Sequence, residues 1–206
     1  MVRPTYVLID GENIDATLGL SVLGHRPSPD ERPRWDRITE FAARLWSQEV
    51  RALFFLNAST GQMPLSFVQA LLALDYHPIP LSGPRDSSVV DMGIQRTLEQ
   101  LNNVPGDILL ATHDGDFVEQ LAQLLNSDRK VGVLCFREFV SAKLADLTHL
   151  GLRMYDLEDD VRAFNTPLPR VRIIDVETYD PTPFLQPHPT ACVPRGGVGG
   201  LVSFVF

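Results

Sequence analysis

Four aspartates in three separated segments have the side chains and positions expected of an oxygen-ligated metal site. Asp10 follows the apolar run "TYVLI", and Asp114 and Asp116 follow the apolar run "DILLAT" with one glycine between them. Asp91 lies between these segments in the chain, in "SSVVDMGIQ". If the segments meet in space, their carboxylates repel one another unless a divalent cation neutralises them. Mg²⁺ or Mn²⁺ held by carboxylates suits hydrolysis of a phosphodiester bond, because it activates water and offsets charge developing on phosphate.

Apolar segments of strand length alternate with segments of helical periodicity along most of the chain. Strands are expected at residues 5–10, 50–57, 77–82, 107–112, 130–136 and 153–157. Helices are expected at residues 34–48, 64–72, 87–102, 116–125 and 140–151. Such alternation predicts an α/β fold whose mostly parallel central sheet is flanked by helices. Pro78 and Pro80 place the third strand at an edge of that sheet.

The predicted sheet explains how distant aspartates could meet. In an open parallel sheet, ligands bind beyond the carboxyl ends of the strands, where the strand order reverses. Asp10 ends the first strand and Asp114 follows the fourth. A strand order of 3-2-1-4-5 would make these two strands neighbours, so that Asp10 and Asp114 face each other. Asp91 and Asp116 begin helices and lie at the same edge.

Each of these residues also has a simpler explanation. An aspartate in the first turn of a helix is stabilised by the helix dipole by roughly 0.3–1 kcal/mol, which could account for Asp91 and Asp116. Asn13 could cap the first helix. A strand-end aspartate beside a glycine can also belong to a turn. The combination on adjacent strands is harder to explain in this way than any single member.

Composition sets the class of protein. The chain has 206 residues, 44% hydrophobic and 21% charged, with a formal net charge of -8. This balance predicts a globular protein and argues against broad electrostatic capture of nucleic acid, while leaving room for a local basic patch. Apolar runs are too short to span a membrane and the amino terminus does not resemble a signal peptide, so we expect no membrane association and a cytoplasmic location.

The carboxyl-terminal part differs from the rest. From Thr166 onward prolines cluster and "RGGVGG" follows, so we expect a domain at residues 1–165 and a Pro/Gly-rich extension at 166–206, with one strand at 171–176. Cys135 and Cys192 do not form a disulfide framework or a zinc motif. The sequence does not identify protein partners, and a homo-oligomer is possible.

Four segments together resemble the ordered motifs of the NYN domain, the LabA-like branch of the PIN-like nuclease superfamily. They are "YVLIDGEN" (6–13), "VVDMGIQRTL" (89–98), "LLATHDGDFVEQL" (109–121) and "SAKLADL" (141–147). The resemblance covers roughly residues 4 to 158, and "IDGEN" combined with "DGDF" is its most specific part. It implies a three-layer PIN-like fold and a ribonuclease that depends on Mg²⁺ or Mn²⁺.

Carried over by motif, the resemblance implies catalytic and metal-binding roles for Asp10, Asp91, Asp114 and Asp116. Asn13 would be a polar partner. Further substrate contacts could come from the Thr112 hydroxyl, from His113 at a phosphate or as a proton shuttle, and from Arg85 or Arg96 at a phosphate. The predicted function is therefore a metal-dependent endoribonuclease that hydrolyses RNA phosphodiester bonds.

Two departures from the motifs favour an alternative function. Many relatives carry a lysine shortly before the middle acid, where this chain has Ser88, Val89 and Val90, and a further acid where it has Thr97. The alternative is a catalytically weak or inactive RNA-binding or regulatory module with the same fold. Toprim-like and phosphatase-like sites are disfavoured, because the first strand ends in "IDGEN" and lacks both a strand-end glutamate and an Asp-x-Asp pair.

Overall fold

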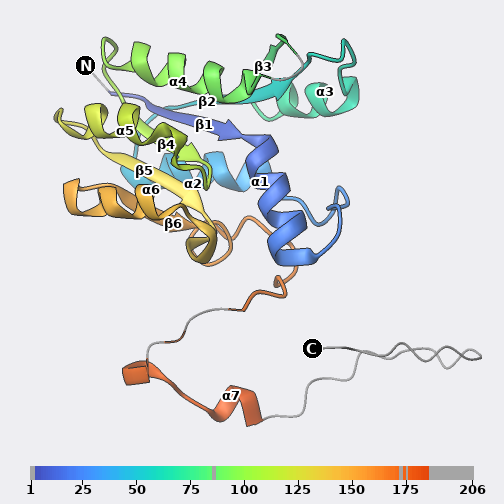
Figure 1. Cartoon of the computed structure of the whole chain (residues 1–206), viewed down its shortest axis with the longest axis vertical. Helices are drawn as coiled ribbons and strands as arrows, with labels where there is room; N and C mark the ends of the chain where they lie inside the picture. The colour runs from blue at the N-terminus through green and yellow to red at the C-terminus, as the bar shows by residue number, and fades with distance from the viewer. Residues whose placement is uncertain (1–2, 85–86, 172–173, 175, 186–206) are drawn as a thin grey trace, which may run out of the picture. The chain divides into compact units, whose positions relative to one another are not determined.

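A sheet of six parallel strands forms the centre of the protein (Figure 1). The computed structural model describes residues 3–84, 87–171, 174 and 176–185. The strands are β1 (Thr5–Asp10), β2 (Val50–Asn57), β3 (Tyr76–Leu81), β4 (Asp107–Ala111), β5 (Val131–Cys135) and β6 (Arg153–Asp156). Their order is β3-β2-β1-β4-β5-β6, and every neighbouring pair is parallel.

Helices cover both faces of the sheet. The α-helices are α1 (Gly11–Thr17), α2 (Trp35–Trp46), α3 (Leu65–Ala73), α4 (Val89–Leu101), α5 (Val118–Leu125), α6 (Ala142–Asp146) and α7 (Thr182–Leu185). Short 3-10 or π-helical segments are η1 (Leu18–Leu23), η2 (Gly115–Phe117), η3 (Arg137–Phe139), η4 (Leu147–Leu150) and η5 (Val176–Thr178). Within the described residues, none of these helices is long and apolar enough to cross a membrane.

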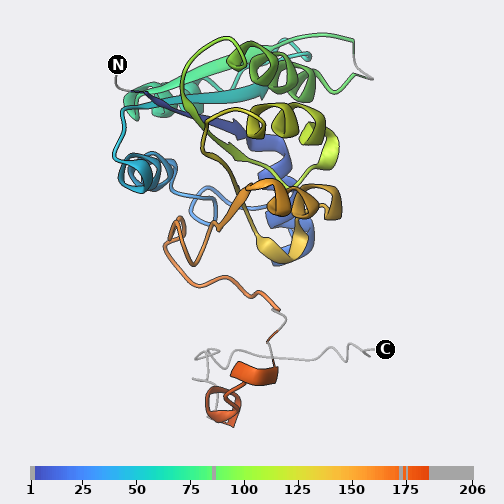
Figure 2. The same cartoon turned by 90° about the vertical axis from the view of Figure 1, so that its left-hand side faces the viewer.

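The three layers follow from two hydrophobic clusters, one on each face of the sheet. Residues of α1, α2 and α3 pack with one face, and residues of α4, α5 and α6 pack with the other. Figure 2 shows α2, in light blue, on one side of the strands and α4 to α6, in green to orange, on the other. The expected α/β fold is therefore confirmed, and the architecture is consistent with a three-layer PIN-like fold.

The sequence pattern of each strand matches its place in the sheet. Every residue of β4 and β5 is buried, as expected of internal parallel strands, and apart from Asp107 at the start of β4 none of these residues is polar. β3 carries Pro78 and Pro80 and lies at the edge, where a missing backbone donor is tolerated. The predicted neighbourhood of the first and fourth strands is confirmed by the pairing of Ile9 with Ala111.

Several elements differ in detail from the prediction. The expected helix at 140–151 is the short helix α6 continued by the 3-10 segment η4. After β1 the chain forms α1 and then the π-helical η1, which ends at Gly24 with φ 73°. For the predicted strand at 171–176, residues 172, 173 and 175 lie outside the described residues, and Val176 begins the 3-10 segment η5.

The chain divides into two compact units, Met1–Val171 and Arg172–Phe206. Residues 166–171, which the sequence pattern places in the extension, thus belong to the first unit. Arg37 on α2 helps to hold the preceding segment, because its guanidinium donates to the carbonyl oxygens of Arg162 (3.1 Å) and Phe164 (2.8 Å). Arg170 bonds the end of this segment to Glu138 and Asp156 in the rest of the unit.

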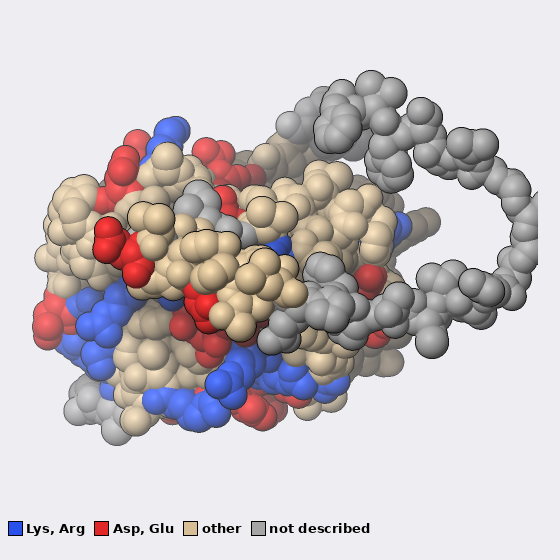
Figure 3. All heavy atoms as spheres, turned by 90° about the horizontal axis from the view of Figure 1, so that it is seen from below, with Lys and Arg blue, Asp and Glu red and all other residues tan. Residues whose placement is uncertain are grey.

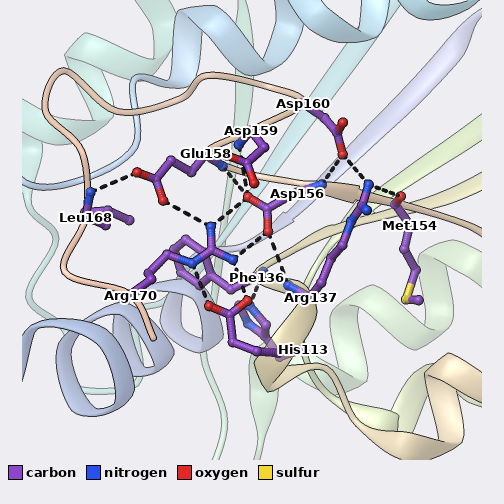
Figure 4. Close-up of polar contacts among 11 residues, drawn as sticks. His113, Phe136, Arg137, Met154, Asp156, Glu158, Asp159, Asp160, Leu168 and Arg170 are labelled. Atoms are coloured by element: carbon purple, nitrogen blue, oxygen red, sulfur yellow. Dashed lines mark hydrogen bonds and ion pairs between the residues drawn. The ribbon is translucent and has the colours of Figure 1, made fainter. Parts of the chain in front are cut away.

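Arg170 is the centre of a buried charge cluster (Figure 4). Its side chain is 1% exposed and binds Asp156, at the end of β6, through two bonds of 2.7 and 2.6 Å. It also binds Glu138, and Glu158 at 3.1 Å, and lies 4.9 Å from the centre of the Phe136 ring. Such bidentate pairs hold a buried arginine more firmly than a lysine could.

The cluster sets the protonation of its acids. Burial alone would raise the pKa of Asp156, but the Arg170 guanidinium and the backbone N–H groups of Asp159 and Glu158 hold that pKa well below its usual value. A carboxyl whose pKa is lowered by folding stabilises the folded state above the pKa of the unfolded chain. That contribution is lost as the pH falls below about 4, the usual range of an aspartate.

We expect Arg170→Met to destabilise the protein by roughly 3–5 kcal/mol at pH 7, because Asp156 and Glu138 would stay buried without their cation. Urea unfolding measures this loss. Arg170→Lys should recover only part of it, since an ammonium group cannot form the bidentate pairs.

The difference between the wild type and Arg170→Met should narrow at pH 4, where the acids begin to bind protons. Arg153→Met is a matched control, because Arg153 is exposed on β6 and its replacement should change stability by less than about 0.5 kcal/mol. Equal unfolding midpoints for Arg170→Met and the wild type would contradict the structural role of Arg170.

Candidate carboxylate site

Asp10 is the buried centre of the candidate site. It ends β1 and caps α1, with its Oδ1 accepting from the backbone N–H of Asn13 at 3.2 Å. Its Oδ2 accepts from the Thr112 hydroxyl at 3.0 Å. Burial raises the pKa of Asp10 to about 7; these two hydrogen bonds oppose the shift, and the charges of Asp91 and Asp114 add to it. Near neutral pH this carboxyl is therefore close to half-protonated.

Asp114 and Asp116 lie just beyond the end of β4, beside Asp10. Thr112 joins the two strands, because its hydroxyl donates to Asp10 and accepts from the backbone N–H of Asp114 at 3.2 Å. Asp114 in turn caps the turn η2, with Oδ1 accepting from the N–H of Asp116 at 3.0 Å. Asp114 is half-buried and Asp116 is exposed. The structure therefore brings Asp10 and Asp114 to the same edge of the sheet.

Asp91 approaches the same edge from the first turn of α4. Burial raises its pKa, a hydrogen bond from Ser88 opposes this, and the charges of Asp114 and Asp116 raise it further. The Gln95 side chain, one turn along α4, donates to the carbonyl oxygen of Asp116 at 3.1 Å and ties this helix to η2. Asp91 thus interacts electrostatically with each of the other three predicted acids.

Glu12 is a fifth carboxylate that the sequence reasoning did not select. Burial raises its pKa, the charge of Asp91 adds to this, and a hydrogen bond from Asn57 opposes it. The sequence positions of Glu12 and Asn57 could have indicated both residues. Glu12 lies two residues after Asp10 in "IDGEN", and Asn57 ends β2, so the strand-end rule that selected Asp10 applies to Asn57 as well.

The donor set fits a hard divalent cation by its chemistry. All candidate ligands are carboxylate oxygens, and the pKa of Asp10 is raised chiefly by burial and further by the charges of Asp91 and Asp114. As the side chains lie, no group of three His, Cys, Asp or Glu residues in the described part of the chain forms a ready metal-binding arrangement. Asp10 and Asp114 each use Oδ1 to cap the segment that follows, which turns that oxygen toward the protein.

His113 lies in the wall of the site, with both ring nitrogens engaged. Nε2 accepts from the backbone N–H of Phe136 at 2.8 Å, so the proton is assigned to Nδ1, which lies 2.9 Å from Oδ1 of Asn13. Burial lowers the pKa of His113 to about 4, and its ring stacks on Phe136. The geometry therefore gives this histidine a positioning role.

Asn13 links the first helix to the loop after β4. Besides its contact with the ring of His113, its Oδ1 accepts from the backbone N–H of His113 at 2.8 Å. The cap of α1 is supplied by Asp10 and not by the Asn13 side chain. Asn13, Asp10 and Thr112 thus hold β1, α1 and β4 in one register at the edge where the acids gather.

The two arginines predicted to contact a phosphate are Arg85 and Arg96. Arg85 lies outside the described residues. Arg96 is exposed on α4, five residues after Asp91, which on an α-helix places it about 140° around the axis from that acid. Arg96 is therefore not on the helix face that Asp91 and Gln95 turn toward η2.

Comparison with known proteins supports the fold alone. No family model and no curated protein matches this chain. Among solved structures, a protein of unknown function from Vibrio parahaemolyticus is similar, with a TM-score of 0.58 and 18% sequence identity. The similarity covers 77% of this chain and 95% of that one. The similarity thus supports the fold over most of the chain and carries no activity with it.

Proposed function

We propose that this protein is a metal-dependent endoribonuclease that hydrolyses RNA phosphodiester bonds at the carboxylate cluster. The observation that carries the proposal is the buried carboxyl of Asp10, whose pKa of about 7 reflects burial together with the neighbouring charges of Asp91 and Asp114. Without a cation, concentrating these acids at one edge of the sheet only destabilises the fold. Perturbed carboxyls of this kind are typical of functional sites.

Asp10, Asp91, Asp114 and Asp116 are the residues that would hold Mg²⁺ or Mn²⁺. Such an ion supplies Lewis acidity at the scissile phosphate and makes water a better nucleophile. Neighbouring side chains would hold these acids in position. Thr112 fixes Asp10 against β4, and Asn13 with His113 fixes the loop that carries Asp114, so that the carboxylates keep their spacing.

The class of substrate is inferred from the resemblance to NYN domains, and the distribution of charge allows it. Acidic and basic side chains lie interspersed on the face seen in Figure 3, so this face does not present a broad basic surface. Of the 18 basic residues only Lys130 and Lys143 are lysines, and arginine forks suit phosphate oxygens. A cation among the acids would remove the repulsion that phosphate otherwise meets at this edge.

The alternative is an RNA-binding or regulatory module that has lost efficient chemistry. Two observations favour it. The residues before Asp91 are Ser88, Val89 and Val90, so the lysine common in NYN motifs is missing. Thr97 replaces an acid of those motifs and donates its hydroxyl to the carbonyl oxygen of Gly93 within α4, away from any ligand role.

Asp10→Asn and Asp114→Asn should each lower Mn²⁺-dependent cleavage of a labelled single-stranded RNA by at least about 100-fold, the upper end of the cost of losing an outer-shell partner. Gel analysis of the products measures this. Asp146→Asn, in the exposed last turn of α6, is the matched control and should cleave like the wild type. Stabilisation of the wild type by Mn²⁺ without cleavage would support the module; activity retained in both variants would contradict the proposed site.

The raised pKa of Asp10 predicts a pH dependence of stability. Because folding raises this pKa from 3.8 to about 7, the folded state holds the proton more tightly, and stability falls as the pH rises from 4 to 7. By pH 7 the free energy of unfolding should have fallen by roughly 4 kcal/mol in total, at about 1.36 kcal/mol per unit of pKa shift. Asp10→Asn lacks this dependence, although its amide oxygen accepts only one of the two hydrogen bonds at a time.

In urea unfolding with EDTA, the wild type should therefore be the more stable protein at pH 4.5, and Asp10→Asn should equal or exceed it at pH 8. Mn²⁺ at pH 8 should stabilise the wild type and leave the variant nearly unchanged. If the two proteins keep a constant difference from pH 4.5 to 8, the carboxyl of Asp10 is not perturbed and the proposed metal site loses its main support.

A further inference from the structure

A cavity of about 610 Å³ opens beside the carboxylate cluster, and the proposed chemistry does not use it. It lies between α1, the carboxyl end of β2, the amino end of α2 and the start of α3. Its walls include Gly11, Glu12, Arg26, Trp35, Phe54 and Phe67. The volume falls within the roughly 300–1,000 Å³ of small-molecule sites. Glu12 belongs to both places, because it lines the cavity and its carboxyl feels the charge of Asp91.

The floor of the cavity is aromatic. Phe54 is buried and makes edge-to-face contacts with Trp35 at 4.9 Å and with Phe67 at 5.3 Å between ring centres. Phe67 is half-buried on α3 and lines the opening. Gly11 lets α1 approach this floor, since a Cβ atom there would lie 2.6 Å from Phe54. A flat ring can stack on such a surface.

The rim of the cavity carries one arginine that is available to a ligand. Arg32 is bound by Asp15 through its Nε, at 3.1 and 2.9 Å, and through a second nitrogen at 2.8 Å. The guanidinium of Arg26 is exposed and has no hydrogen bond or ion pair to any residue that the structure describes. An aromatic floor with one free guanidinium at the rim combines the two groups that bind a base and its phosphate.

We propose that this cavity binds one nucleotide of a single-stranded RNA next to the scissile phosphate. The base stacks on Phe67, whose ring packs against the buried Phe54, and Arg26 contacts the phosphate. This inference rests on the proposed function, because the carboxylate edge beside the cavity is where the chain would be cut. A base must leave a duplex before it can enter, so the cavity selects unpaired RNA. Arg26 and Phe67 are substrate-positioning residues.

The test measures binding apart from cleavage. A fluorescein-labelled single-stranded RNA of ten nucleotides is titrated into Asp10→Asn protein in EDTA, and binding is followed by anisotropy. Adding Phe67→Leu should weaken binding on the order of tenfold, the effect of losing one stacked base. Adding Arg26→Ala should weaken binding and make the slope of log affinity against log salt shallower by about 0.7, the value for one phosphate contact on a single strand.

Matched controls separate the cavity from general effects. Leu72→Ala removes an exposed apolar side chain from the same helix as Phe67, and Arg44→Ala removes an exposed arginine from the last turn of α2. Both should bind like the Asp10→Asn parent. Thermal melting of each variant verifies that it is folded. The same RNA annealed to its complement should bind more weakly than the single strand.

The outcomes distinguish this inference from the proposed function. If the wild type cleaves RNA with Mn²⁺ but neither Phe67→Leu nor Arg26→Ala weakens binding, the cavity inference is wrong and the nuclease stands. If both variants weaken binding while the wild type never cleaves, the cavity binds RNA in a non-catalytic module. Equal affinity for duplex and single strand would overturn the inference, and so would no measurable RNA binding by the parent either in EDTA or with Mn²⁺ present.

Discussion

The electrostatic cost of burying Asp10 among other acids is the constraint on which the rest of this structure depends. The carboxyl lies at the point where the strand order reverses, between β1 and β4, so the acids that follow these strands are brought together by topology. Hydrogen bonds from Asn13 and Thr112 offset part of the cost, but the pKa of about 7 indicates that much of it remains. A bound cation, as in the proposed function, would offset this remaining cost.

Contacts among His113, Phe136 and Arg170 support the carboxyl edge of the sheet from outside the carboxylate cluster. The ring of His113 accepts from the backbone of Phe136 and stacks on the Phe136 side chain, whose ring also lies beside the Arg170 guanidinium. Packed aromatic and charged groups therefore run without a break from Asn13 to residue 170. His113 therefore lies between the acids of the site and the acids that bind Arg170.

Much of the fold and part of the site could be predicted from the sequence. The apolar runs that end at Asp10 and before Asp114 fix the strands, and the rule for parallel sheets then brings both acids to one edge. The partners of these side chains could not be predicted, because they depend on three-dimensional contacts. Nε2 of His113 meets a backbone group 23 residues away, and Arg170 reaches acids 14 and 32 residues away. Because the composition from Thr166 onward is rich in proline, the sequence predicts an extension there and gives no sign that Arg170 is buried.

The position of Arg170 has a practical consequence for where the folded domain is cut from the rest of the chain. The last strand ends at Asp156, and secondary structure alone would suggest trimming soon after it. Expression of residues 1–165 would delete the only described cation bonded to the buried Asp156 and Glu138 carboxylates, and we expect that shortened protein to aggregate. Crystallisation or screening of the isolated domain should retain residues up to at least Val171.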